Sequence, residues 1–122
     1  MTGLAQIGGL HHYAYKCRNA EETRSFYEDL LGLPLAHVIQ ADEVPSTGAS
    51  DPYIHLFFEF ADGSYIAFFD LGDEKACTPD HETPSWVNHF AMHVPTVQDV
   101  KRWKERLEYA GIDVIGITDH DF

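Results

Sequence analysis

The sequence predicts an α+β fold in which two βαβββ modules form a curved mixed sheet around a cavity, with the second module incomplete in this chain. Two observations support this prediction: a short histidine-containing pattern occurs twice, and each copy precedes a helix with its own start and stop signals. A third is the Asp62-Gly63 dipeptide between two aromatic-rich runs, a strong β-hairpin signal. We expect one domain, with a first module at about 8–70, a linker at 71–85 and a truncated second module at 86–122.

The repeated pattern reads histidine, aromatic residue, alanine, large apolar residue. It occurs at 12–17 (HYAYKC) and again at 89–94 (HFAMHV), and both segments are expected to be strands. In each copy the histidine precedes a residue of N-cap type, Asn19 or Thr96, by the same distance (12 to 19 and 89 to 96). Agreement in both pattern and spacing is harder to obtain by chance than one matched histidine, so the two halves are predicted to be related.

Each predicted helix has recognisable ends. The first begins at Asn19 and ends at Gly32, and Pro34 prevents its continuation. The second begins at Thr96 and ends at Gly111. Both carry apolar residues at helical spacing, which predicts one buried face on each.

Strands are expected at 35–40, 53–60 and 64–70, with a polar loop at 41–52, and at 112–118 after the second helix. A two-residue turn at Asp62-Gly63 would pair His55 with Asp70, which gives His55 a structural role. The same register would place one apolar set on a shared face that is either core or the wall of a pocket: Leu56, Phe58, Phe60, Tyr65, Ala67 and Phe69. From this set Phe58, Tyr65 and Phe69 are the candidate substrate-binding residues.

Composition limits the possible partners. The formal net charge is −12, from 20 acidic and 8 basic residues, which makes nucleic acids and anionic membranes poor partners. No apolar run reaches the length of a membrane span, and 1–9 lacks the pattern of a secretory signal. Cys17 and Cys77 form no CxxC motif, so we expect two unpaired thiols and a cytoplasmic location.

The two pattern histidines are the candidate metal ligands. Because side chains alternate along a strand, His12 should face away from the first helix, and His89 away from the second. Two related halves would bring both imidazoles to one concave surface, where they can bind a divalent ion. His11 is the alternative ligand, although its neighbour His12 fits the repeat better. His37 is expected to be a surface group.

These segments resemble the vicinal oxygen chelate superfamily, which includes glyoxalases, bleomycin-resistance proteins and extradiol dioxygenases. The resemblance rests on the run 9–12 (GLHH) with its strand, on the helix 19–33, and on 88–91 (NHFA) with its capped helix. It covers nearly the whole chain and implies the paired-module fold. It also implies that His12 and His89 are metal ligands.

Departures from the family pattern bear on the reaction that the resemblance implies. Glyoxalases and epimerases carry a Glu or Gln ligand where this chain has Ala67, and fosfomycin-resistance enzymes a threonine where it has Ala14. Extradiol dioxygenases use two histidines and a final-strand Glu, which would lie beyond Phe122, and bind Fe(II) at such a triad. Their acid–base histidine aligns with Ser64, which leaves His120 as the candidate catalytic residue.

The resemblance therefore implies a metal-dependent, dioxygenase-like enzyme of extradiol type acting on a small catecholic or related aromatic compound. Fe(II) is the expected metal, with Mn, Zn or Ni as alternatives. Two other functions stay open: another metal-dependent member of the family (a lyase, isomerase or thiol transferase), and a metal-free small-molecule binding or resistance protein. We also expect a homodimer, because an incomplete second module would expose a sheet edge.

Overall fold

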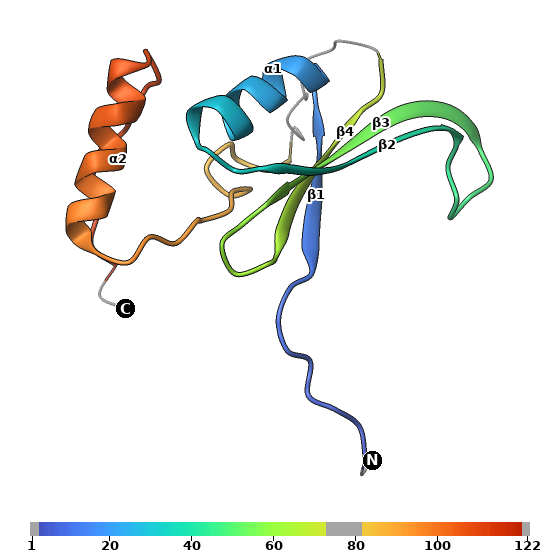
Figure 1. Cartoon of the computed structure of the whole chain (residues 1–122), viewed down its shortest axis with the longest axis horizontal. Coiled ribbons are helices and arrows are strands. Elements are labelled where there is room, and N and C mark those ends of the chain that lie inside the picture. Colours follow the sequence, from blue (N-terminus) through green and yellow to red (C-terminus); the bar gives the residue numbers. More distant parts are fainter. Residues whose placement is uncertain (1–2, 73–81, 121–122) are drawn as a thin grey trace. The chain divides into compact units, whose positions relative to one another are not determined.

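The structure, a computed structural model, describes residues 3–72 and 82–120. The chain divides into two compact units, Met1–Thr78 and Pro79–Phe122, and each is described by itself. Figure 1 shows the elements of both units along the chain. None of the helices in the described ranges has the length and apolarity needed to span a bilayer.

The first unit is built on a curved, unclosed mixed sheet with strand order β1-β4-β3-β2 (Figure 1). Parallel pairing joins β1 (His12–Cys17) to β4 (Tyr65–Asp70). Antiparallel pairing joins β4 to β3 (Ser50–Glu59), and β3 to β2 (Leu35–Glu43). The predicted βαβββ order of the first module is therefore confirmed. The strands β2 and β3 are longer than predicted, because part of the expected loop 41–52 pairs with itself as strand.

The first helix begins where the sequence predicts but changes its winding. The side chain of Asn19 accepts a hydrogen bond from the backbone N–H of Glu22 at 2.9 Å, which caps α1 (Ala20–Arg24). The next segment, η1 (Ser25–Leu30), is a π-helix in place of the predicted α-helix. Its wider winding lets the Arg24 guanidinium reach Asp29, five residues on, as well as Glu21 and Glu28. A side-chain clamp of this kind is not encoded in apolar periodicity, so the sequence pattern could not reveal it.

Tyr27 packs the helix against the sheet. Its ring lies 5.4 Å from that of Phe58 and 4.8 Å from that of Phe68, between ring centroids. The buried apolar side chains of the sheet are Cys17, Leu56, Phe58, Ile66, Ala67 and Phe68. Burial raises the pKa of Tyr27 from 10.0 to about 12.

The turn between β3 and β4 differs from the predicted one by one residue. Phe60 donates its N–H to the carbonyl of Ser64 at 2.8 Å, so the turn contains three residues, 61–63. Gly63 adopts a φ of +86°, and the Asp62 side chain accepts the N–H of Ser64 at 2.9 Å. A type I turn followed by a left-handed residue gives this three-residue hairpin. The two-residue prediction was therefore wrong, and the register shifts by one.

Asp70 ties the end of β4 to the start of the helix. One carboxylate oxygen accepts the N–H of Ala20 and the other accepts the N–H of Gly72, both at 2.8 Å. The expected pairing of Asp70 with His55 was wrong, because Asp70 lies opposite Ile54. Asp70 instead satisfies a backbone donor at the N-terminus of α1, where a negative charge is also favourable.

In the second unit, residues 82–120 contain one helix, α2 (Val97–Tyr109), capped by Thr96 as predicted. The hydroxyl of Thr96 accepts the N–H of Asp99 at 3.1 Å and donates to its carboxylate at 2.7 Å. The strands expected at 89–94 and 112–118 are not formed. A strand needs a hydrogen-bonding neighbour, and among residues 82–120 no ladder supplies one.

Replacing Asp70 with alanine should lower the free energy of unfolding by about 1–2 kcal/mol, because two backbone donors lose their acceptor. Urea denaturation measures this change. The matched control is Asp62→Ala, whose hydrogen bonds lie in an exposed turn and whose loss should cost less. Equal effects of the two substitutions would contradict the role of Asp70.

The partial burial of Tyr27 predicts a pH dependence of stability. Because its folded pKa lies above its unfolded value, the neutral phenol stabilises the fold fully below pH 10.0, and this contribution is lost as the pH rises through about 12. The difference in unfolding free energy between the wild type and Tyr27→Phe should therefore decline over this window. A difference that does not vary with pH would refute the raised pKa of Tyr27.

Candidate metal and substrate site

His12 lies on the sheet face opposite the helix, as its alternation with Tyr13 predicts. It begins β1, pairs with Tyr65 of β4, and is exposed. Its ring lies 5.3 Å from the ring of Phe57, between centroids. Tyr15, an odd-numbered β1 residue like Tyr13, contacts Phe68 on the helix side, which confirms that the two faces alternate as expected.

The observed register decides which other residues share the face of His12. The rows on this face come from odd-numbered positions of β3 and β4: Tyr53, His55, Phe57, Tyr65, Ala67 and Phe69. Tyr65 and Phe69 were predicted to share a face, and they do. Phe58 was expected beside them, and that placement was wrong: it is 0% exposed and packs under Tyr27 on the other face. The three-residue turn is the physical reason, because a one-residue shift exchanges the two faces of a strand.

His55 is the residue whose surroundings differ most from the expectation. It lies opposite Phe69, and the two rings stack with centroids 3.7 Å apart and planes 15° apart. The side chain is only 9% exposed, and its Nε2 is buried with no hydrogen-bond partner among the described residues. Burial, and secondarily the charge of His12, lowers the pKa of His55. A buried unpaired nitrogen costs roughly 1–3 kcal/mol.

His37 also reaches this face rather than standing apart as a surface group. A bulge in β2 brings it opposite Phe57, and its ring lies 5.7 Å from that of Tyr65. Sequence reasoning did not place His37 or His55 in the candidate site. The alternation of Tyr53, His55 and Phe57 along β3 indicates that these three side chains share a face. The wrong turn length placed that face opposite Tyr65 and Phe69 instead of beside them.

The ring nitrogens of both predicted ligands are oriented by neighbours. His89, in the second unit, has Nδ1 3.0 Å from the carbonyl oxygen of Val87, so Nδ1 carries the proton and Nε2 keeps its lone pair. The Nδ1 of His12 lies 2.9 Å from the Nδ1 of His11, and one of the two donates to the other. A hydrogen bond donated by the other ring nitrogen is how proteins orient metal-binding histidines, so His89 fits a metal site, and His12 fits one when its Nδ1 donates to His11.

The described residues do not by themselves complete a metal site. No group of three or more His, Cys, Asp or Glu side chains within 3–72 and 82–120 has the spacing of a metal centre. Ala67 has no donor atom and is 0% exposed. His120, the candidate catalytic residue, lies in an exposed irregular segment of the second unit.

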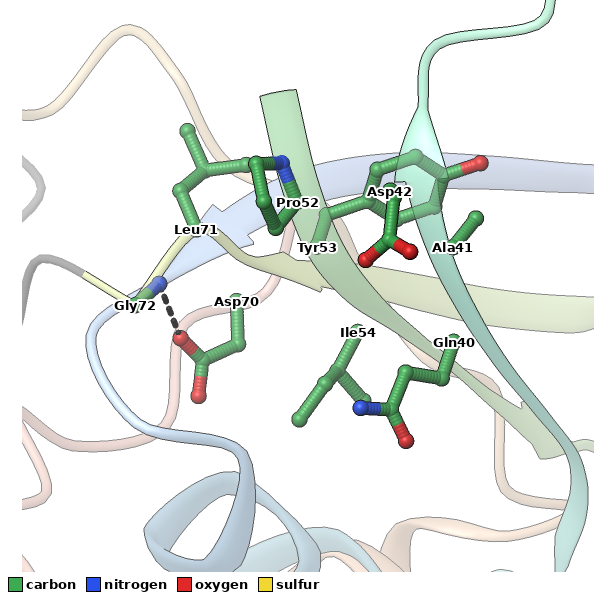
Figure 2. A pocket seen from close by; sticks show the side chains of 9 residues that line it. All are labelled: Gln40, Ala41, Asp42, Pro52, Tyr53, Ile54, Asp70, Leu71 and Gly72. Atoms are coloured by element: carbon green, nitrogen blue, oxygen red, sulfur yellow. Dashed lines mark hydrogen bonds between the residues drawn. The ribbon is translucent and has the colours of Figure 1, made fainter. Parts of the chain in front are cut away.

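A separate pocket of about 260 Å³ opens where the sheet ends, around Tyr53, Ile54 and Asp70 (Figure 2). It lies at the opposite end of β4 from Tyr65, the partner of His12. Figure 2 shows the Asp70 carboxylate engaged with the N–H of Gly72. This pocket contains none of the predicted site residues.

Comparison with known proteins connects this geometry to a family. Residues 9–122 match the family model of the Glyoxalase/Bleomycin resistance protein/Dioxygenase superfamily. Over 130 aligned residues the chain is 25% identical to the Bacillus subtilis (strain 168) protein named "Putative ring-cleaving dioxygenase MhqA". The match covers 95% of this chain but 38% of that protein, so the chain spans well under half the length of this relative.

Solved structures share the fold. The fosfomycin resistance protein FosX from Listeria monocytogenes, crystallised as an E126Q mutant with Mn(II) and 1S,2S-dihydroxypropylphosphonic acid, aligns with a TM-score of 0.63 at 16% identity, covering 95% of this chain and 79% of that one. A glyoxalase/dioxygenase from Nostoc punctiforme aligns with a TM-score of 0.61 at 22% identity, covering 98% and 84%. Since the family model matches nearly the whole chain, the chain belongs to the Glyoxalase/Bleomycin resistance protein/Dioxygenase superfamily.

Proposed function

We propose that this chain is the catalytic part of a metal-dependent dioxygenase of extradiol type, acting on a small catecholic or related aromatic compound. One observation carries the proposal: His12 stands on a sheet face lined with aromatic rings, beside Phe57 and Tyr65. The similarity to MhqA, a protein described as ring-cleaving, supports the same reaction class.

His12 and His89 are the residues that would hold the metal, through their Nε2 atoms. A bound Fe(II), or alternatively Mn, Zn or Ni, would supply a Lewis acid with open positions for adjacent substrate oxygens. Two imidazoles are too few for a complete site, and a carboxylate is the proposed third ligand. Ala67 has no donor atom, so the neighbouring position of β4 supplies no ligand.

The chain's own side chains have separate tasks in this proposal. Tyr65 and Phe69 offer half-buried aromatic surface to a flat substrate ring. Their apolar surroundings exclude water from the ring and strengthen polar contacts made to it. His120 is proposed to accept or return a proton at a ring hydroxyl, a role that histidine fills more often than any other side chain.

Metal content tests the ligand assignment. His12→Ala and His89→Ala should each remove most of the bound divalent metal, because each deletes a direct donor. The matched control is His37→Ala, which removes an imidazole from the same sheet face and should leave metal content near that of the wild type. Elemental analysis gives metal per chain, and circular dichroism checks folding. Full occupancy in both ligand variants would refute the assignment.

Two further measurements separate the alternatives. Dioxygen consumption with a panel of catechols by the metal-loaded protein supports the extradiol reaction, whereas metal binding without consumption favours another metal-dependent activity of the family. Binding of aromatic compounds by a protein that takes up no metal would favour a metal-free binding function. Light scattering tests the proposed homodimer, which a monomer at working concentration would contradict.

A further inference from the structure

We infer that His55 is a ligand-contacting residue, and that the unpartnered Nε2 of its imidazole hydrogen-bonds a hydroxyl group of an aromatic ligand. The inference rests on the proposed function, since it concerns the substrate of the same sheet face. It adds a residue that determines which aromatic rings bind, separately from the residues proposed to hold the metal.

The first argument is the missing hydrogen bond. Among the described residues, the Nε2 of His55 is buried without a partner, although buried polar atoms are almost always paired. The cross-strand neighbour that could have satisfied it is Phe69, which offers only a ring face. An apolar ring at this position of β3 would avoid the cost of an unpaired nitrogen, so the imidazole lowers the free energy of unfolding relative to such a ring.

The second argument is the surroundings of the imidazole. His55 stacks on Phe69 and contacts Phe57, with ring centroids 4.3 Å apart in the second pair. Phe57 also contacts His12, so the aromatic rings run without interruption from His55 to the proposed metal ligand. Phe57 and Phe69 are half-buried. A flat ligand that displaces one of these rings would stack on His55 in its place, and its hydroxyl would add a hydrogen bond to Nε2.

The third argument is the kind of group that fits this nitrogen. Burial lowers the pKa of His55, so its ring is neutral near pH 7 and Nε2 is either a donor or an acceptor, depending on the tautomer. A hydroxyl both donates and accepts, and therefore satisfies either tautomer. A phenolic ring combines that hydroxyl with a flat apolar surface, which matches Phe57 and Phe69.

The test compares two ligands and three proteins, all metal-free, so that no result depends on metal loading. The ligands are catechol and o-xylene, in which methyl groups that cannot hydrogen-bond replace the two hydroxyls. The proteins are the wild-type chain, His55→Phe, which keeps a stacking ring without nitrogen, and His55→Gln, which restores an amide N–H. Dissociation constants come from nuclear magnetic resonance titration, and the imidazole ¹⁵N shifts of His55 are followed in the wild type.

We expect His55→Phe to weaken catechol binding about tenfold, equivalent to about 1.4 kcal/mol, and to leave the binding of o-xylene unchanged. His55→Gln should recover part of the loss, and catechol alone should move the imidazole shifts. His55→Phe should also melt at or above the wild-type temperature, because it removes an unpaired buried nitrogen.

Three results would overturn the inference. Equal catechol affinity in the wild type and His55→Phe would show that the nitrogen does not contact the ligand. A lower melting temperature for His55→Phe would show that Nε2 has a structural partner. A wild type that binds neither compound would show that the face takes no aromatic ligand; if such a protein still binds metal through His12 and His89, the metal assignment stands while the aromatic substrate class fails.

Discussion

The register between β3 and β4 is the constraint on which the rest of the candidate site depends. Since side chains alternate along a strand, a shift of β3 by one residue would send His55 and Phe57 to the helix side and bring Leu56 and Phe58 to the face of Phe69. The three-residue turn ending in Gly63 sets this register, and the stack of Tyr27 on Phe58 and Phe68 reinforces it from the other side. The apolar core and the aromatic face are therefore two consequences of one pairing.

The same sheet shows how stability and binding divide between its two faces. On the helix side the central side chains are apolar and buried, and Asp70 joins the end of β4 to the helix N-terminus through the N–H of Ala20. On the other side the imidazoles of His12, His37 and His55 stand among half-buried rings, and the Nε2 of His55 is buried without a partner in the part of the chain that the structure describes. Polar groups left unsatisfied are expected where a protein is built to bind something. That contrast, more than any single residue, is why we assign function to this face.

Helix ends and strand faces could be predicted from the sequence because the signals for them are local. Asn19 and Thr96 are capping residues, Gly32 stands where the first helix ends, and the alternation of β1 places His12 opposite the helix. Three features were not predictable in this way. The π-helical winding that lets Arg24 reach Asp29 is not encoded in apolar periodicity, the turn length depends on whether Gly63 closes a two- or three-residue loop, and the strands of the second unit need a pairing partner. Phe58 and His55 were placed on the wrong faces for the second of these reasons alone.

The central claim is that His12 and His89 bind one divalent ion together. X-ray absorption spectroscopy of the Fe(II)-loaded full chain, prepared without oxygen, tests it most directly because it counts the imidazoles bound to the metal. The account predicts two imidazole ligands in the wild type and one in any residual metal-bound His89→Ala protein. A wild-type spectrum without imidazole ligands, or one that His89→Ala leaves unchanged, would contradict it.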